Sequence, residues 1–361
     1  MSLIQTLPDG PLDIVGDIHG EYEALRHLLR HLGYDEQGHH AAGRTLVFVG
    51  DFCDRGPDSP AVLALVESLV EAGRAVAVLG NHEINLLRED AKDGSGWFFD
   101  ERKERDQVRY APFNDTDQSA RRKIMAFLSR LPIALERADL RVIHAAWIGD
   151  KIDQIRHLPA GSVREHYDAW EKVARQCAQE LEPRIAEEGL GWEHDLEDAL
   201  HAPPFMHGLA DKEALKQMMN PLKVLTSGVE RKGEAAFYSS GRWRFTERVQ
   251  WWNEYAEGIP VVVGHYWRRF GSTDVNDNKG GPDLFDGVPA HAWHGKTGNV
   301  FCVDFSVGAR WSARKANQPL AARFKLAALQ WPERVLRFDD GVVMETEGFL
   351  IFSKKIQGYA D

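Results

Sequence analysis

Three short apolar segments near the start of the chain each end in a glycine that is followed at once by a polar, metal-type residue. They are residues 12–15, 46–49 and 75–79, and they lead into the sequences GDIHG, GDFCDRG and GNHE. Apolar runs of this length predict buried strands, and a helical pattern follows each one, over residues 21–32, 60–72 and 83–89. Repeated strand, loop and helix units predict a parallel sheet whose strands all end at one edge.

The polar residues after these strands are therefore expected to be neighbours in space. They are Asp17, His19, Asp51, Asn81 and His82. Any one of these loops alone is equally well explained as a helix cap or a turn. Three loops with the same arrangement favour a binding site, because ligands of open α/β sheets lie at the carboxyl ends of strands.

The three motifs, in this order and spacing, resemble the calcineurin-like metallophosphoesterases, and within them the branch of phosphoprotein phosphatases and symmetrical diadenosine tetraphosphate hydrolases. That family also uses two later histidines, each after an apolar strand. Here residues 140–143 lead into His144, and residues 261–264 lead into His265. The resemblance implies an α/β fold, a sandwich of two packed mixed β-sheets flanked by helices, in a single domain over residues 1–361.

The resemblance also implies a dinuclear metal site at the strand ends. The expected ligands are Asp17, His19 and Asp51 for one ion, and Asp51, Asn81, His144 and His265 for the other. Asp51 would then bridge the two ions. Oxygen and imidazole donors together suit borderline divalent ions, so we expect Mn first, with Fe, Zn or Ni as alternatives. Two such ions can share a hydroxide that attacks phosphorus directly.

Residues close to these ligands carry the expected catalytic roles. Arg55 offers a planar donor fork for phosphate oxygens, and Asn81 is expected to contact the phosphate as well. His82 is expected to protonate the leaving oxygen, with Asp54 orienting its ring. The alternative for Asp54 and Arg55 is a structural ion pair. A second phosphate-binding arginine is left open among Arg231, Arg242 and Arg244.

The substrate is less well defined than the reaction. The chain has His144-Ala145-Ala146, where protein phosphatases of the family carry His-Gly-Gly and the nucleotide-cleaving relatives His-Ala-Gly. Residues 300–308 and 324–334 resemble the end of the phosphatase domain of bacterial polynucleotide kinase-phosphatases. We expect a serine/threonine-phosphatase-like phosphomonoesterase. The alternatives are a symmetrical dinucleoside polyphosphate hydrolase, a nucleic-acid-end phosphatase and an inactive metal-binding scaffold.

Composition narrows the partners. A formal net charge of -11 argues against extended nucleic-acid binding, which needs clustered basic residues. The expected partner is therefore a phosphorylated protein or nucleotide. The start of the chain has no signal-like pattern and no segment reaches the length of a membrane span, so cytoplasmic residence is the expectation. Three cysteines, Cys53, Cys177 and Cys302, are too few for a disulfide framework or a cysteine cage.

Two segments stand apart from the repeated pattern. Residues 91–117 are charged and show no sustained period, which predicts an irregular loop, either a lid or a surface insertion. Residues 151–220 predict a helical insertion, with a capping box at Ser162 and Glu165. Its histidines (His157, His166, His194, His201 and His207) are expected not to bind metal. Strands are expected again over residues 222–225, 235–238, 261–263, 300–305, 324–329 and 334–338.

Overall fold

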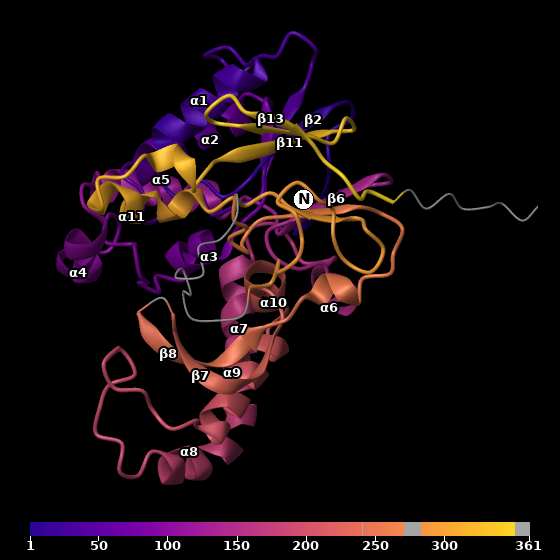
Figure 1. Ribbon diagram of the computed structural model, residues 1–361. Coiled ribbons are helices and arrows are strands. Elements are labelled where there is room, and N and C mark those ends of the chain that lie inside the picture. The colour runs from indigo at the N-terminus through magenta and orange to yellow at the C-terminus, as the bar shows by residue number, and fades with distance from the viewer. Residues whose placement is uncertain (240, 271–282, 351–361) are drawn as a thin grey trace, which may run out of the picture.

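The computed structural model describes residues 1–239, 241–270 and 283–350, and two mixed β-sheets form its centre (Figure 1). In this described part, one sheet has the strand order β13-β12-β11-β2-β3-β4. Its strands are β2 (Leu12–Val15), β3 (Thr45–Phe48), β4 (Ala75–Ala77), β11 (Ala327–Trp331), β12 (Val335–Phe338) and β13 (Val343–Glu345). Strands β2, β3 and β4 are parallel, as the repeated motif predicts. The late strand β11 runs antiparallel to β2.

The second sheet has the order β1-β5-β6-β9-β10. Its strands are β1 (Ile4–Thr6), β5 (Ala134–Arg137), β6 (Leu140–Ile143), β9 (Val261–Val263) and β10 (Val300–Cys302). Strands β6, β9 and β10 are parallel to one another, so their carboxyl ends also lie at one edge.

The core explains why the central strands are apolar throughout. In β3, Val47 belongs to the hydrophobic cluster shared by the two sheets, whereas Leu46 and Phe48 belong to the cluster that includes the helices. In β9, Val262 belongs to the first cluster and Val261 and Val263 belong to the second. Both faces of each strand are therefore buried, as a layer order of helix, sheet, sheet, helix requires.

The helices around the sheets are α1 (Tyr22–Leu32), α2 (Ser59–Glu71), α3 (Asn81–Leu87), α5 (Gln118–Leu128), α6 (Gly149–Ile155) and α11 (Arg310–Lys315). The first three lie where the patterns after the front motifs predict them. Asp58 caps α2, because its carboxylate accepts the backbone N–H of Ala61 at 3.0 Å. Short 3₁₀ turns occupy Ala178–Leu181, Trp251–Asn253, Val307–Ala309 and Leu320–Ala322. No described helix combines the length and apolar character needed to cross a membrane.

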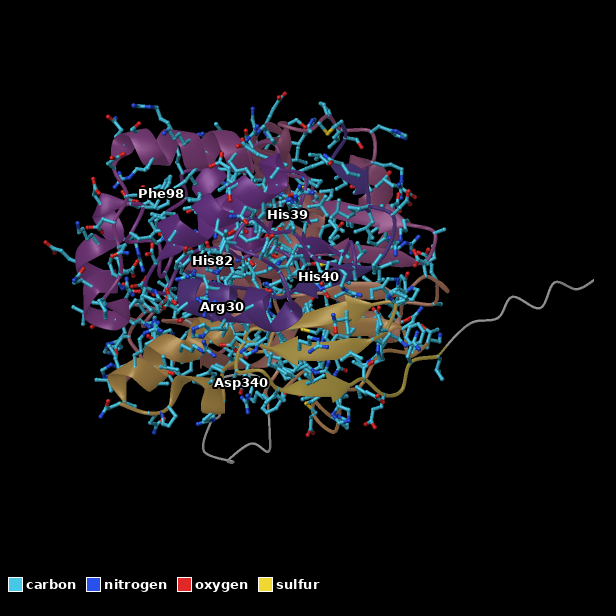
Figure 2. The ribbon with its side chains drawn as sticks, turned by 90° about the horizontal axis from the view of Figure 1, so that it is seen from above. Arg30, His39, His40, His82, Phe98 and Asp340 are labelled. Atoms are coloured by element: carbon cyan, nitrogen blue, oxygen red, sulfur yellow. The ribbon has the colours of Figure 1, made fainter. Side chains whose placement is uncertain are left out.

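A smaller lobe projects from the sandwich (Figure 1). It contains α7 (Val163–Cys177), α8 (Glu182–Glu188), α9 (His207–Met219) and a hairpin of β7 (Glu230–Ser239) and β8 (Arg242–Arg248). The hairpin packs on α9 around a small cluster of Met206, Ala210 and Phe245. Viewed from above, the C-terminal strands, marked by Asp340, lie beside the first helix, marked by Arg30 (Figure 2). This proximity follows from the contact between α1 and β12.

The structure corrects three expectations. Residues 222–225 form helix α10 (Pro221–Ser227) instead of a strand. A four-residue apolar run does not distinguish the two, and the caps decide, since Pro221 opens the helix and Asn220 accepts the Lys223 N–H. Ser162 makes no capping bond to α7, because its hydroxyl donates to the Pro159 carbonyl instead.

The third correction concerns residues 91–117, which contain helix α4 (Asp100–Tyr110) and are not an irregular loop. Only Asp106 and Tyr110 of this helix are buried, so its apolar stripe is too narrow to give a clear period. Acidic residues in the first turn, Asp100 and Glu101, favour the helix start electrostatically.

Candidate dinuclear metal centre

The candidate ligands come from both sheets. Asp17 follows β2, Asp51 follows β3, and Asn81 opens α3 just after β4. His144 follows β6 directly, and His265 follows β9 after one glycine. The residues predicted from separate motifs therefore lie together at the carboxyl edges of the two sheets.

Glycines let the strand ends approach closely enough for this. Gly50 has a φ of 99°, and a Cβ there would lie 2.5 Å from the Gly80 nitrogen. A Cβ on Gly264 would lie 2.0 Å from Oδ1 of Asp17. Any other residue at either position would push neighbouring ligand loops apart.

Asp51 lies at the centre of the cluster, as a bridging ligand should. Its Oδ2 atom is 3.3 Å from Nε2 of His144 and 3.7 Å from Nε2 of His19. Oδ1 of Asn81 lies 3.2 Å from Nε2 of His144 and 3.0 Å from Nδ1 of His265. The Asp17 carboxylate lies against His265, whose backbone N–H it accepts at 3.0 Å.

Hydrogen bonds fix the orientation of two of the imidazoles. Nδ1 of His19 donates to the Cys53 carbonyl at 3.0 Å, and Nδ1 of His144 donates to the Val49 carbonyl at 2.8 Å. A carbonyl oxygen can only accept, so the Nε2 atoms of both rings are directed toward Asp51. A nitrogen lone pair facing a carboxylate is repulsive unless a proton or a cation lies between them.

The charges of the buried groups also fit a cation. Burial, together with the neighbouring Asp304, raises the pKa of Asp17. Burial opposes charge on His144, but the Asp51 carboxylate overcomes it and raises the pKa of His144 to about 10. Within the described residues, Nε2 of His265 is buried and has no hydrogen-bond partner. Bound divalent ions would replace the protons that Asp17 and His144 tend to hold, and they would neutralise the buried carboxylates.

Two groups of three residues are close enough to hold ions, and they share Asp51. They are His19, Asp51 and His82, and Asp51, His144 and His265. The first group includes His82, whose Nε2 atom lies 3.9 Å from Oδ2 of Asp51. His82 therefore lies beside the metal cluster, and its expected role as a proton donor remains a prediction.

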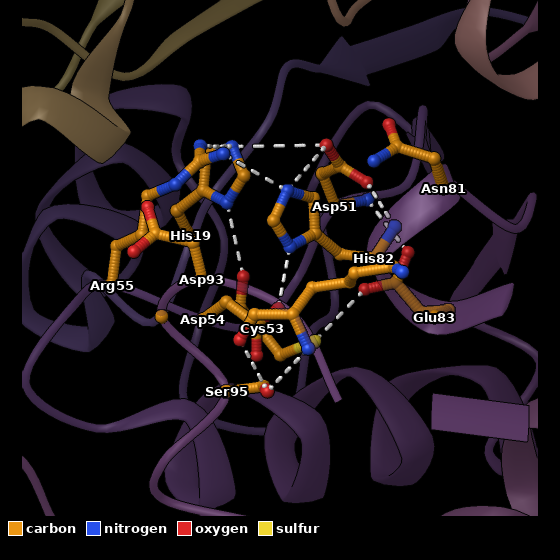
Figure 3. A network of polar contacts seen from close by, with 12 residues as sticks. His19, Asp51, Cys53, Asp54, Arg55, Asn81, His82, Glu83, Asp93 and Ser95 are labelled. Carbon is orange, nitrogen blue, oxygen red and sulfur yellow. Dashed lines mark hydrogen bonds and ion pairs between the residues drawn. The ribbon is translucent and has the colours of Figure 1, made fainter. Parts of the chain in front are cut away.

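The catalytic candidates are in contact with one another (Figure 3). Nδ1 of His82 lies 2.5 Å from Oδ2 of Asp54. The Arg55 guanidinium lies 3.1 Å from Nε2 of His82, and it donates to Nε2 of His19 at 3.0 Å. Asp54 therefore pairs with His82, and the expected alternative of an Asp54–Arg55 ion pair is not what the structure shows. Arg55 also stacks on the Trp267 ring, with its guanidinium carbon 4.8 Å from the ring centre.

Two further residues, Glu83 and Trp97, organise the site, although the sequence motifs do not indicate a role for them. Glu83, the last residue of GNHE, accepts the backbone N–H groups of Asp51 and Phe52 at 2.8 Å each and of Gly80 at 3.0 Å. It therefore fixes two ligand loops at once. Trp97 donates its indole N–H to Oδ1 of Asp54 at 2.6 Å, and no local sequence signal indicates that contact.

Asp304 is a further buried carboxylate that the motif analysis did not identify. It accepts the backbone N–H groups of Trp267 at 2.7 Å and Ser306 at 2.8 Å. By holding the backbone of Trp267, it supports the ring beneath Arg55. Its signal was present, because Asp304 directly follows the apolar run 300–303, as the ligands of the other strands do.

The structure favours a different arginine as the second candidate for phosphate binding than those expected from the sequence. Arg231 pairs with Glu247 at 2.7 Å and its side chain is 68% exposed, while Arg242 pairs with Glu213 at 3.2 Å. Arg248 instead lies over the Tyr266 ring, 5.9 Å from its centre. After burial, the charge of Arg248 is the largest cause lowering the pKa of His265. The third candidate, Arg244, lies 3.5 Å from the Ser239 carbonyl. Arg248, which the sequence did not single out, is the arginine of this hairpin whose charge acts on the candidate ligand His265.

A third group of metal-type residues lies on the lobe and is exposed. It consists of His194, Asp198 and His201. The two imidazoles stack at 3.8 Å with an angle of 8° between their planes. In parallel rings, the nitrogen lone pairs of His194 and His201 do not point toward one ion. A pairing of His201 with Asp198 at 2.7 Å accounts for the cluster, and the prediction that these histidines bind no metal is retained.

Two packed sheets with carboxylate, amide and imidazole donors around one shared carboxylate are the arrangement that a two-metal hydrolytic centre requires. The family model for calcineurin-like phosphoesterases matches residues 10–220, more than half of the chain. The chain belongs to this family, which places it among hydrolases that act on phosphoester bonds.

Curated relatives match part of the chain. The asymmetrical bis(5'-nucleosyl)-tetraphosphatase PrpE of Oceanobacillus iheyensis is 46% identical over 80 residues, covering 21% of this chain and 32% of the relative. A symmetrical bis(5'-nucleosyl)-tetraphosphatase of Aeromonas salmonicida is 31% identical over 183 residues, covering 49% of this chain and 53% of the relative. The chain thus spans about a third to a half of these relatives.

Among solved structures, a cold-active protein-tyrosine phosphatase of a psychrophilic Shewanella species aligns with 95% of this chain and 83% of its own length. The sequence identity is 19% and the TM-score is 0.43.

Proposed function

We propose that this chain is a metal-dependent phosphoesterase that hydrolyses phosphomonoesters. The observation that carries the proposal is the position of Asp51, whose Oδ2 atom lies 3.3 to 3.9 Å from ring nitrogens of three different histidines. Such a carboxylate can be shared by two ions. The proposed ligands are Asp17, His19, Asp51, Asn81, His144 and His265. Bound divalent ions would supply Lewis-acid activation of water and of the phosphoryl group.

Arg55 and Arg248 are the proposed phosphate-binding cations. Arg55 lies on one side of the cluster, between His19 and His82. Arg248 lies over the Tyr266 ring, and its charge acts on His265. Two guanidinium groups at the site would hold non-bridging phosphate oxygens and orient the ester, with Asn81 as a further contact.

His82 is the proposed proton donor to the leaving oxygen. Burial opposes charge on this ring, but the carboxylates of Asp51 and Asp54 outweigh burial and raise the pKa of His82. A raised pKa favours the imidazolium form that a proton donor needs, and the Asp54 contact keeps Nδ1 occupied so that Nε2 faces the site.

The second candidate substrate class is dinucleoside tetraphosphates, because the curated relatives carry that activity in their names. Both candidates use the same site and differ in the group beyond the reacting phosphate. We further propose that the whole chain is one domain, that residues 151–220 form a cap on it, and that residues 91–117 border the site.

A substrate panel with added Mn tests the proposal. It comprises a nitrophenyl phosphate, phosphoserine and phosphothreonine peptides, dinucleoside tetraphosphates and end-phosphorylated oligonucleotides. We expect release of inorganic phosphate from the first two classes. Release of nucleoside diphosphates as the dominant activity would support the second candidate. No turnover of any substrate by protein shown to hold metal would favour an inactive scaffold.

A further inference from the structure

The turn that carries two of the catalytic candidates is strained. Asp54 and Arg55 are consecutive non-glycine residues with φ values of 72° and 71°. Such conformations are unfavourable for residues other than glycine and persist only when surrounding contacts hold them.

Residues 94–97 supply these contacts, and we name them the clamp segment. The backbone N–H of Arg55 donates to the Gly94 carbonyl at 3.1 Å. The indole N–H of Trp97 donates to Oδ1 of Asp54 at 2.6 Å, while Oδ2 of Asp54 binds His82. Trp97 is 2% exposed and Asp54 is fully buried, so water does not compete for these bonds.

Asp106 of helix α4 fixes the clamp segment in turn. Its Oδ2 atom accepts the backbone N–H groups of Gly94 at 3.1 Å and Gly96 at 2.8 Å. This carboxylate is 1% exposed. Figure 3 shows that Asp93 and Ser95 lie beside the Asp54 and Arg55 turn.

We propose that the clamp segment, anchored by Asp106, is the positioning element of the active site. Trp97 sets the direction of the Asp54 carboxylate and through it the ring of His82. Gly94 sets the backbone of Arg55 and through it the guanidinium. Trp97 and Gly94 are positioning residues and touch no substrate. The inference rests on the proposed roles of His82 and Arg55.

Trp97→Phe tests the first half. Phenylalanine keeps an aromatic ring but removes the N–H that binds Asp54. The matched control is Trp331→Phe, which removes an indole hydrogen bond to Asp139 of 2.8 Å, far from the site in strand β11. We expect Trp97→Phe to lower kcat on phosphoserine peptide about tenfold, a smaller loss than deletion of a general acid causes. The loss of kcat on nitrophenyl phosphate should be clearly smaller than the loss on phosphoserine peptide. Trp331→Phe should leave both values near wild type.

Gly94→Ala tests the second half. A Cβ at Gly94, where φ is 92°, would lie 2.8 Å from Cγ of Arg55. Gly43→Ala is the matched control, since φ is 65° there and a Cβ would meet nothing within 4 Å. Both variants carry the same kind of backbone strain, but only the first displaces Arg55. We expect Gly94→Ala to raise KM several-fold on both substrates and Gly43→Ala to change only the melting temperature.

These outcomes separate the inference from the proposed function. Folding of every variant is checked by circular dichroism and thermal unfolding, and metal content by mass spectrometry. The positioning role would be overturned if Trp97→Phe lost kcat equally on phosphoserine peptide and nitrophenyl phosphate. It would also be overturned if both Trp97→Phe and Gly94→Ala had the kinetics of the wild type. A wild type without phosphoesterase turnover would overturn the proposed function itself, whereas a His82→Ala variant that retains full kcat on phosphoserine would overturn only the proton-donor role of His82.

Discussion

Nδ1 of His82 lies 2.5 Å from Oδ2 of Asp54, and both side chains are shielded from solvent. The other carboxylate oxygen of Asp54 is occupied by Trp97, so the pair has little freedom to rotate. The other ring nitrogen of His82 faces Arg55 and Asp51. This geometry fits the proposed role of His82 as a proton donor.

The His82–Asp54 pair predicts a leaving-group effect. Proton donation matters for a basic alkoxide and little for an acidic nitrophenolate. His82→Ala should lower kcat on alkyl phosphates on the order of 10²-fold or more, with a distinctly smaller loss on nitrophenyl phosphate. Asp54→Asn should show the same bias more weakly. The measurement is kcat at saturating Mn on both substrates. Loss of metal from His82→Ala would instead make this residue a ligand.

Asp51 and His19 should differ in their effect on metal content. Asp51 lies close to histidines of both candidate ion groups, whereas His19 belongs to only one. Asp51→Asn should therefore reduce occupancy at both sites, and His19→Ala should mainly empty one. Metal analysis by mass spectrometry at fixed Mn provides the comparison. Loss of a single ion in both variants would contradict the bridging position of Asp51.

Metal binding should depend on pH, and activity should depend on bound metal. The pKa of His144 is raised to about 10 in the metal-free site, so this ring must release a proton when an ion binds. Metal affinity should therefore rise with pH between about 6 and 8. Calorimetric titrations in two buffers with different ionisation heats should show that metal binding releases protons. Chelation should abolish activity and Mn should restore it. A fully active, metal-free protein would refute the metal requirement.

Arg248 and Arg231 provide a matched pair on one hairpin. Arg248→Ala should raise KM for phosphate esters about tenfold or more, because a charged phosphate contact contributes about 1.5–3 kcal/mol. Arg231→Ala should leave KM unchanged, since its side chain is 68% exposed and paired with Glu247. Steady-state kinetics on a nitrophenyl ester decide the matter. Equal KM values in the two variants would exclude Arg248 as a phosphate ligand.

Glu171 predicts an acid-sensitive step in stability. Its carboxylate pairs with Lys216 at 2.8 Å and Lys223 at 3.2 Å. Burial opposes ionisation, but the two lysines outweigh it and lower the pKa of Glu171 to about 2. A lowered folded-state pKa stabilises the protein above the unfolded pKa of about 4.5, and this contribution is lost as the pH falls toward 2.

Glu171→Gln should therefore reduce stability at pH 6 by on the order of 1 kcal/mol, and the difference from wild type should shrink as the pH falls below 4.5. Thermal unfolding at several pH values measures it. The control is Glu187→Gln, at an exposed position of α8. A difference that stays constant down to pH 3 would mean that the lysine pairs do not carry the effect.

The metal ligands were predictable from sequence because each follows a buried strand. The pattern of apolar run, glycine and polar residue is local, and it specified Asp17, Asp51 and Asn81 before any contact was known. A family resemblance supplied His144 and His265, and the structure places both with the others. Asp304 also follows an apolar run directly, over residues 300–303, but without the glycine of the front motifs.

The apolar run 222–225 is a helix because its neighbours Asn220 and Pro221 cap it, a local signal that the hydrophobic pattern alone does not reveal. Other features were decided by contacts between distant segments. The roles of Trp97 and Arg248 depend on the approach of segments 43 and 17 residues away from their partners Asp54 and His265.

The sequence by itself determined the strands, the glycine turns and the donor atoms, because steric limits and burial act on neighbouring residues. Only the tertiary structure decided which arginine of the hairpin faces the cluster and which carbonyls orient the imidazoles. It also decided which tryptophan holds Asp54. Those choices depend on distances across the fold, where a shift of one or two ångströms makes or breaks a hydrogen bond.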